Sequence, residues 1–564
     1  MSESSNEAKH GSVGTRLGDF SRLVAPRRLP FDDDALFEVA TAADLPDRLG
    51  DGKDAEENLF VPAGYTYLGQ FVDHDLTLDT TSNLNPDDAT KPTNLRTPAF
   101  DLDCVYGDGP SSQPYLYEEL DGDRVLLRIG KTADERPGRR EAEDDLPRNR
   151  NNQGKIDPEG RAIIGDKRND ENSIVAQIQL AFLKLHNRIV VALKAANPGL
   201  KGNALFAAAR QELTWTYQRM LLEDYLPRIV EADVLGPFVA AWTEQGDGAY
   251  RLYPPALRDR IPIEFAGAAY RFGHSMVRTG YRLNTQTALR VFTFKGTNDE
   301  SLTGFQPLPA SHVIDDWGRF FPEPDLQALW PGRPVAENPG PDQVKIEGPD
   351  AGAPRPGVRL QFAYKIDPSL TGPLSDLPPR ISDFDGGHPR PVKDYSGPSL
   401  ALLNLRRGNK FALASGQRVA AALGADFDHL RPEELRMRTE LDGGWTFVDV
   451  PEKLRASTPL WLYVLAEAQR KIVRHWLATG HGAPVDEAFF FKGQGALSQL
   501  GPVGGRIVTE TFYGLLDADA GSVLNRAPST WKPLVMQGVP AGAPLTFSRM
   551  LRWSGATISN GFGA

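Results

Sequence analysis

The sequence predicts a mainly α protein with long loops and little β structure. Apolar residues recur at helical spacing in several long segments, whereas strand-like alternation is brief. There are 54 glycines and 45 prolines among 564 residues, a larger share than the roughly 12% that is usual for soluble proteins. This excess predicts long connections between the helices.

The clearest predicted helix covers residues 171–196. Its apolar stripe has spacings of four, four, three and four, at Ile174, Ile178, Phe182, Leu185 and Ile189. The helix is expected to end at Asn197-Pro198-Gly199, a run of stop signals. Similar periodicity predicts helices over about 63–78, 203–224, 262–280, 414–423, 459–478 and 495–516. The best strand candidates are 125–129 and 359–364.

Long polar connections separate these helices. Residues 130–161 carry dense mixed charge, and residues 280–400 are rich in loops, with no role that the sequence assigns. Residues 1–15 form a polar tail that we expect to be disordered. No repeat or clear linker divides the rest, so 16–564 is predicted to be one large domain whose core helices lie within 63–516.

Composition excludes several classes of protein. The net charge of −11 argues against a general nucleic-acid binder. The single cysteine, Cys104, excludes an intramolecular disulfide framework and a cysteine-ligated zinc or iron–sulfur centre. No apolar run approaches 18 residues, so no membrane span is predicted. The N-terminal residues lack the apolar region of a secretory signal, so we expect a cytoplasmic protein or one exported without a leader.

The most unusual stretch places a histidine between two aspartates, within residues 69–75. Gln70 and His74 are four residues apart and share a helical face, with Asp73 and Asp75 to either side. One helical turn therefore offers a glutamine and a histidine to one site and Asp75 to another. On residue types alone, a surface helix with a solvated charge cluster is an equally good interpretation.

An acidic loop follows. Thr97, Asp101 and Asp103 place oxygen-bearing side chains at positions i, i+4 and i+6, with backbone carbonyls such as that of Ala99 between them. Calcium takes six to eight oxygen ligands from loops of this kind. Asp75 would supply a third carboxylate, although acidic turns are common without a metal.

Three further motifs carry polar side chains in or beside apolar helices. Arg168 and Glu171 are three residues apart before the long helix, where acidic residues also suit the helix dipole. Gly273 precedes His274 and would let a flat ligand approach closely; a lone histidine in a helix is more often a core residue. Residues 403–407 place an amide and two guanidiniums in an apolar stretch.

Five motifs occur in one order from about residue 69 to 407: GQFVDHDL, TPAFDLDCVYG, GDKRNDE followed by LKLHNR, YRFGH, and LNLRR. Together they resemble the animal-type haem peroxidases of the peroxidase–cyclooxygenase superfamily, such as myeloperoxidase and lactoperoxidase. A weaker likeness at GPVGGRIVTETF extends towards residue 512. The resemblance implies a large single-domain helical haem-peroxidase fold, with 16–564 as the catalytic domain.

The resemblance also implies roles on the distal side of a haem b. His74 resembles the distal histidine, which takes a proton from peroxide and returns it to the leaving oxygen. Arg168 resembles the distal arginine, which stabilises the charge that develops during O–O cleavage. Gln70 matches the distal glutamine that borders the water and halide position.

On the proximal side, His274 resembles the histidine that binds the haem iron. Asn404 resembles its partner, which accepts the ring N–H and fixes the tautomer. Arg271 and Arg407 match arginines that serve the haem propionates in this family.

Covalent haem attachment is a further implication. Asp73 and Glu171 match the two carboxylates that form ester bonds to haem methyl groups. Asn172 stands where myeloperoxidase has the methionine of a third, sulfonium link, so that bond is expected to be absent. A lower redox potential than that of myeloperoxidase follows, which favours bromide, iodide, thiocyanate and phenolic donors over chloride.

The resemblance implies a calcium ion bound by Asp75, Thr97, the carbonyl of Ala99, Asp101 and Asp103. Asp103 occupies a position where the mammalian enzymes have serine, and an additional carboxylate suits an oxygen site. The absence of structural disulfides also departs from the mammalian members and fits a microbial homologue better.

The expected function is therefore the oxidation of small anionic or phenolic donors by hydrogen peroxide through an oxoferryl intermediate. A fatty-acid dioxygenase is the nearest rival; such enzymes have a tyrosine three residues before the proximal histidine, whereas this chain has Arg271 there and Tyr270 one residue earlier. The other rivals are a calcium-stabilised adhesion or scaffold protein with the same fold, and a metal hydrolase. No oligomeric state is predicted, and His186 is predicted to be structural.

Overall fold

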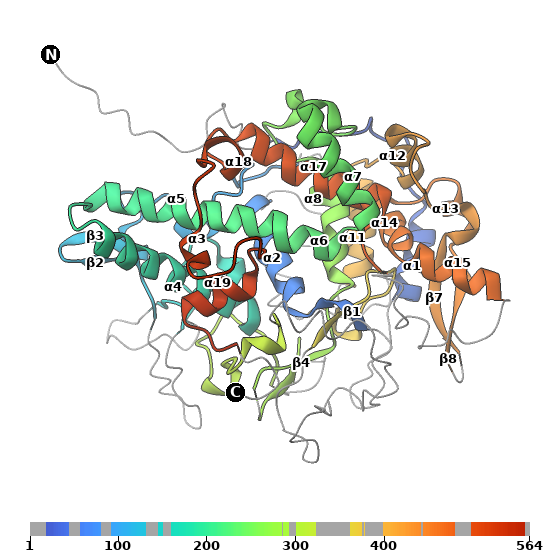
Figure 1. Cartoon of the computed structure of the whole chain (residues 1–564). Coiled ribbons are helices and arrows are strands. Elements are labelled where there is room, and N and C mark those ends of the chain that lie inside the picture. The colour runs from blue at the N-terminus through green and yellow to red at the C-terminus, as the bar shows by residue number, and fades with distance from the viewer. Residues whose placement is uncertain are drawn as a thin grey trace.

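The computed structural model describes residues 19–43, 57–79, 92–130, 145–149, 160–284, 286–292, 300–322, 361–374, 377, 399–441, 444–479 and 498–558. Over these residues the chain is mainly helical, as predicted (Figure 1). The α-helices are α1 (Asp33–Ala43), α2 (Gly64–Leu76), α3 (Asp103–Tyr106), α4 (Ser173–Ala196), α5 (Gly202–Met220), α6 (Leu226–Ile229), α7 (Ala232–Gln245), α8 (Ile263–Gly267), α11 (Leu400–Lys410), α12 (Gly416–Leu423), α13 (Glu452–Arg455), α14 (Leu460–Ala468), α15 (Arg470–Thr479), α17 (Pro502–Ala518), α18 (Val523–Arg526) and α19 (Phe547–Ser554).

The strands form short antiparallel pairs, and no larger sheet occurs in the described parts of the chain. The pairs are β1 (Glu57–Pro62) with β6 (Phe362–Tyr364), β2 (Tyr117–Leu120) with β3 (Asp123–Leu127), β4 (Gly280–Arg282) with β5 (Ala288–Arg290), and β7 (Arg436–Leu441) with β8 (Gly444–Asp449).

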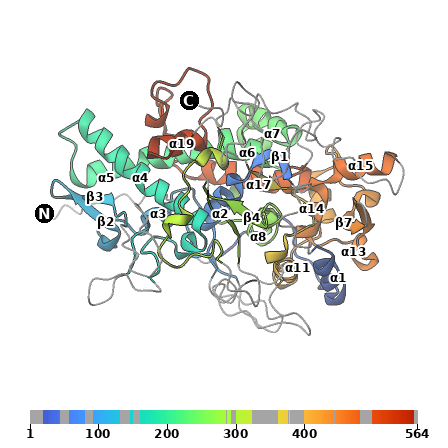
Figure 2. The ribbon, with the colours of Figure 1, turned by 90° about the horizontal axis from the view of Figure 1, so that it is seen from below.

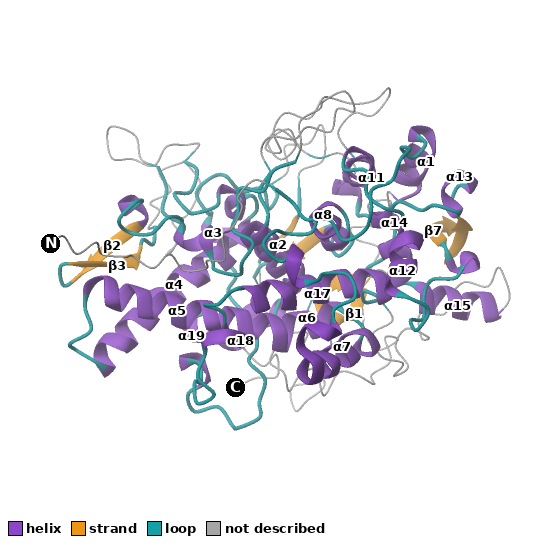
Figure 3. Ribbon diagram, turned by 90° about the horizontal axis from the view of Figure 1, so that it is seen from above, coloured by secondary structure: helices purple, strands orange, loops and turns teal. Residues whose placement is uncertain are grey.

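Helix α2 occupies the middle of the molecule. In all three ribbon views it lies between one end formed by α4, α5 and the β2–β3 pair and another formed by α13, α15 and the β7–β8 pair (Figures 1, 2 and 3). The position of α2 matters because the His74 motif lies in its C-terminal half.

Helices α2 and α4 pack through apolar side chains. The five predicted stripe residues of α4 are fully buried. Phe71 of α2 stacks on Phe182 of α4, with ring centroids 4.4 Å apart, and burial of each ring stabilises the fold by about 1.5–3 kcal/mol. Asn172 caps α4 by accepting the N–H groups of Ile174 and Val175, each at 3.0 Å. This contact fixes the beginning of α4 beside α2.

One cluster of buried apolar side chains extends from Phe31 to Ile558 along the chain. Within the described ranges, α4 alone is long and apolar enough to cross a membrane by length and composition, and 78% of its apolar window is buried inside the protein. That burial is what the core helix of a folded domain shows.

Several helix boundaries differ from the sequence-based prediction. The predicted helix at 262–280 is divided into α8 and the 3-10 helix η6 (Ala269–His274), with a break at Ala268. The predicted helix at 459–478 is divided at Gln469 into α14 and α15, and the one at 495–516 begins only at Pro502. At Ala268 and Gln469 the apolar periodicity continues across the helix break, which is why the sequence did not predict it.

Other expectations concern residues that are only partly described. The predicted tail at 1–15 and most of the charged segment at 130–161 lie outside the described residues. Within 280–400 the described parts include β4, β5 and β6. This region also contributes Val291, Phe292, Leu374 and Leu377 to the cavity described next, a role that the sequence did not indicate.

Candidate functional site

One cavity collects polar side chains from motifs far apart in the sequence. Helix α2, the segment around the 3-10 helix η2 (Lys167–Asp170) and η6 all contribute to its lining. The predicted site residues that line it are Gln70, Asp73, His74, Arg168, Glu171, Arg271 and His274. Residues of motifs that are far apart in the sequence therefore meet at one cavity.

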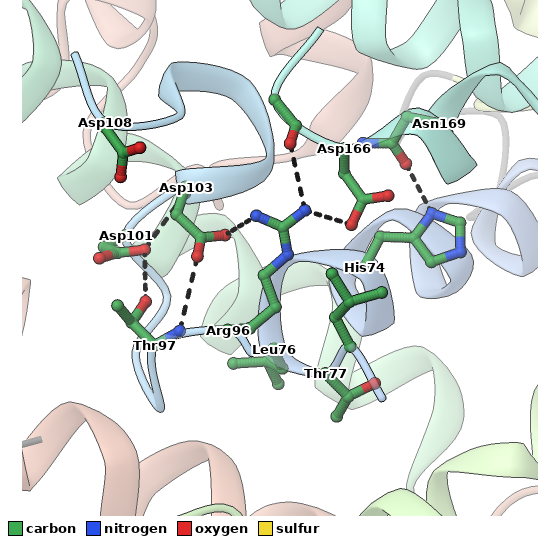
Figure 4. Close-up of polar contacts among 12 residues, drawn as sticks. His74, Leu76, Thr77, Arg96, Thr97, Asp101, Asp103, Asp108, Asp166 and Asn169 are labelled. Carbon is green, nitrogen blue, oxygen red and sulfur yellow. Dashed lines mark hydrogen bonds and ion pairs between the residues drawn. The ribbon is translucent and has the colours of Figure 1, made fainter. Parts of the chain in front are cut away.

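His74 lies in this cavity as a buried side chain, with 5% of its surface exposed. Its Nδ1 is 2.7 Å from Oδ1 of Asn169 (Figure 4). Burial, and then the charge of Arg168, lowers the pKa of His74 to about 4. The imidazole is therefore neutral near pH 7, the state that a general base requires.

Arg168 is held beside His74 by a buried carboxylate. Its Nε lies 3.1 Å and its Nη2 2.8 Å from oxygens of Asp166, and Nη2 also donates to the carbonyls of His74 and Thr77 at the end of α2. Burial raises the pKa of Asp166, but Arg168 and Arg96 outweigh it and hold that pKa below its usual range. The remaining guanidinium nitrogen, Nη1, has no partner within the described structure, and Arg168 lines the cavity.

Gln70 is fixed between two neighbours on the cavity wall. Its Nε2 donates to Glu171 at 3.2 Å, and its Oε1 accepts from Asn172 Nδ2 at 3.2 Å. Asn172 therefore caps α4 and orients Gln70 as well, and neither role was predicted. Asp73 accepts a hydrogen bond from the Thr77 hydroxyl at 2.9 Å.

His274 ends η6 and contacts Asn404 of α11. Asn404 Nδ2 lies 2.9 Å from His274 Nδ1, while the buried Oδ1 of Asn404 has no partner. A histidine that binds iron through Nε2 must carry its proton on Nδ1, and that proton needs an acceptor. A half-turn of the Asn404 amide exchanges its two terminal atoms and supplies that acceptor from the unpaired oxygen.

Arg271 and Arg407, which the resemblance assigns to haem propionates, lie in different places. Arg271 lines the cavity and donates from Nε to the carbonyl of Ala266 at 2.9 Å. Arg407 is buried on α11 but is not among the residues that line the cavity, so its predicted propionate role stays a prediction. A Cβ at Gly273 would meet no atom within 4 Å, so the backbone beside His274 borders open space, and the predicted close approach of a flat ligand there stays a prediction.

The acidic loop forms a second site next to α2. Ligand oxygens of Asp75, Asp101 and Asp103 lie within 4.8 Å of one another. Both oxygens of Asp75 are buried without a hydrogen-bond partner. Burial and the neighbouring carboxylates Asp103 and Asp101 raise the pKa of Asp75, and burial raises that of Asp103 to about 7. Such a cluster is costly unless a cation shares it, and its oxygen donors suit calcium.

The loop reaches this geometry through one unusual backbone conformation. Leu102, between the two aspartates, has φ = 59°, in the left-handed region that costs most residues about 1–2 kcal/mol. The Thr97 hydroxyl donates to Asp101 at 3.0 Å. Ala99 is buried in the same loop, and the predicted ligation by its carbonyl stays a prediction.

An ion-pair chain connects the acidic loop with the cavity. Arg96 Nη1 lies 3.1 Å from Asp103, and Arg96 Nη2 contacts Asp166 (Figure 4). Asp166 in turn contacts Arg168. Asp166 is 1% exposed and Arg96 is 9% exposed at the side chain, so water screens these pairs little. The positive charge of Arg96 also offsets the carboxylate of Asp103.

The predicted structural role of His186 is confirmed. It is fully buried, with Nδ1 2.9 Å from the Tyr106 hydroxyl and Nε2 2.9 Å from the carbonyl of Val125. The sequence did not identify Arg96, Asp166, Asn169 or Gln179. Asp166 and Asn169 flank Arg168 in the motif, so proximity in sequence was the only available signal.

Residues 75–303 match the family described as animal haem peroxidase. Thyroid peroxidase from Rattus norvegicus is 32% identical over 124 residues, which are 22% of this chain and 13% of that protein. Heme peroxidase 2 from Caenorhabditis elegans is 27% identical over 135 residues, 24% of this chain and 18% of that protein. The matched part of the chain spans less than a fifth of either relative.

The fold comparison extends over nearly the whole chain. Peroxidase A from Dictyostelium discoideum superposes with a TM-score of 0.53 at 16% identity, covering 99% of this chain and 95% of that one. This likeness shows a shared fold. The comparisons therefore show an animal haem peroxidase match over residues 75–303 and a shared peroxidase fold over nearly the whole chain.

Proposed function

We propose that this chain is a haem peroxidase, folded as one catalytic domain, that uses hydrogen peroxide to oxidise small donors. The observation that carries the proposal is the meeting of His74, Arg168 and His274 in one cavity. These residues come from three segments separated by about a hundred residues each. A structural role alone does not require a neutral base, a cation and an iron-ligating side chain to line the same space.

In this proposal His74 transfers a proton, Arg168 stabilises charge and His274 binds the cofactor. His74, neutral near pH 7, accepts the proton of hydrogen peroxide and delivers it to the leaving oxygen. Arg168 stabilises the negative charge that develops as the O–O bond breaks. Haem, held by His274 with Asn404 behind it, supplies the redox chemistry when bound.

The cavity supports the oxidation of small anions and phenols. Arg168 places a guanidinium on the cavity wall, and Gln70 adds an amide to the same lining. Asn172 has no sulfur and is engaged with Gln70 and the beginning of α4, which supports two covalent links at most. Bromide, iodide, thiocyanate and phenols are the proposed donors.

One experiment separates this function from that of a fatty-acid dioxygenase. We expect the haem-loaded chain to oxidise a phenolic donor with hydrogen peroxide under anaerobic conditions. A chain that failed this assay but consumed oxygen with linoleate in air would be a dioxygenase.

We propose ester bonds between haem and the carboxylates of Asp73 and Glu171, in which each carboxylate oxygen would bond to a haem methyl carbon that loses a hydrogen, with one hydrogen peroxide as the two-electron oxidant for each bond. Both side chains line the cavity. After treatment with hydrogen peroxide, haem is expected to stay with the protein during acid–acetone extraction, and Asp73→Asn combined with Glu171→Gln is expected to release it. Complete release from the treated wild type would contradict the proposal.

We propose calcium as the ion shared by Asp75, Asp101 and Asp103, with Thr97 and the Ala99 carbonyl as further ligands. The unpaired buried oxygens of Asp75 support it. Asp101→Ala is expected to lower both the calcium content and the thermal stability, because the remaining carboxylates then repel without a bridging ion. Asp259→Ala, which removes a carboxylate outside the cluster, is the control. An unchanged metal content in Asp101→Ala would refute the site.

A further inference from the structure

Asn169 is a buried side chain beside His74 that the mechanism above leaves without a role. Its Oδ1 lies 2.7 Å from His74 Nδ1 (Figure 4). Its Nδ2 donates to Gln179 Oε1 of α4 at 2.8 Å. Asn169 and Gln179 are both fully buried, so no solvent competes for these hydrogen bonds.

The donor and acceptor atoms in these two hydrogen bonds determine which ring nitrogen of His74 carries the proton. With Asn169 Nδ2 committed to Gln179, the atom that faces His74 is a carbonyl oxygen, which can only accept. His74 Nδ1 must then carry the proton, which leaves the lone pair of the neutral ring on Nε2. Nε2 has no hydrogen-bond partner within the described structure. Without an acceptor at Nδ1, the ring is free to carry its proton on Nε2, and that form cannot accept another there.

We propose that Asn169, oriented by Gln179, is a positioning residue that fixes the tautomer of His74 and so presents Nε2 as the proton acceptor. The inference rests on the proposed peroxidase function, in which His74 is the base and Asn169 fixes its tautomer.

The test compares two variants of the haem-loaded ferric protein. Asn169→Leu removes the acceptor at similar size, whereas Asn169→Asp keeps an oxygen that can only accept. The rates of reaction with hydrogen peroxide and of cyanide binding are both measured, because hydrogen cyanide must also lose a proton to a base as it binds. We expect Asn169→Leu to slow both rates about 10- to 100-fold, and Asn169→Asp to stay close to wild type. Gln179 Nε2, unpaired in the wild type, is then available to donate to the new carboxylate.

Gln177→Leu is the matched control for packing. Gln177 lies on α4, the helix that also carries Gln179. Its buried amide donates to the carbonyls of Ser173 and His312, and it has no contact with His74. Its rates are expected to match wild type, and an equal slowing in Gln177→Leu and Asn169→Leu would show a general packing effect. Should Asn169→Leu fail to fold, Gln179→Leu against Gln179→Glu repeats the comparison, since only glutamate keeps an acceptor for Asn169.

Two results would overturn the inference while leaving the peroxidase proposal intact. These are unchanged rates in Asn169→Leu, or equal losses in Asn169→Leu and Asn169→Asp. A wild-type protein that binds haem but does not react with peroxide would instead refute the proposed function.

Discussion

Replacing His74 with leucine is expected to slow the reaction with hydrogen peroxide by about 10²- to 10⁴-fold, the usual contribution of a positioned acid–base group. Leucine fills the buried position without offering a proton acceptor. Haem binding is expected to persist, because His274 is unchanged. His429→Leu is the control, since His429 contacts the carbonyl of Gly424 and lies outside the cavity lining. A loss of less than tenfold in His74→Leu would remove His74 from the base role.

The pH dependence of the same reaction follows from the environment of His74. Burial and Arg168 lower its pKa to about 4, so the neutral form predominates above that pH. The wild-type rate is expected to hold from neutral pH down to about pH 4 and to fall below it as the ring gains a proton. This decline is expected to be absent from the residual rate of His74→Leu. A wild-type decline centred near pH 6.5, the ordinary histidine value, would contradict the account.

Asp166→Asn is expected to destabilise the folded protein by about 3–5 kcal/mol, because it leaves the buried guanidinium of Arg96 and the partly buried one of Arg168 without their shared carboxylate. Urea or thermal unfolding at pH 7 measures the loss. Asp121→Asn, which breaks an exposed pair with Lys194, is the control and is expected to change stability little. A loss of stability in Asp166→Asn that is no larger than in the control would show that the ion pairs of Asp166 with Arg96 and Arg168 do not stabilise the fold.

This stability also depends on pH. The pKa of Asp166 is lower in the folded protein than the ordinary value of about 3.9. Its contribution is therefore fully present above that ordinary value and is lost as the pH falls towards the folded pKa. Asp166→Asn is expected to differ most from wild type near neutral pH and progressively less in acid.

The sequence predicted those parts of the structure that a single regular spacing of residues determines. The apolar stripe on α4 predicted its buried face, and the spacing of Gln70, His74 and Asp75 predicted that one turn of α2 serves two sites. Helix breaks such as that at Ala268 were missed, because backbone geometry interrupts the helix while the apolar pattern continues.

The sequence did not predict the contacts that hold the site residues in place. The Arg96–Asp166 pair joins residues 70 positions apart, and the Asn169–Gln179 bond depends on how η2 meets α4. Val291 and Leu374 line the cavity from a region with no recognisable motif. These contacts depend on how distant segments pack, and a local pattern does not encode that.

We propose that His274 and His74 make one peroxide-reactive haem site. The most direct test is the visible spectrum of the purified chain after haem supplementation, recorded before and after one equivalent of hydrogen peroxide. We expect a Soret band that is lost or altered in His274→Ala, a rapid change with peroxide in the wild type, and recovery on addition of iodide or a phenol. A wild-type protein with no Soret band, or with a band that peroxide does not change, would contradict it.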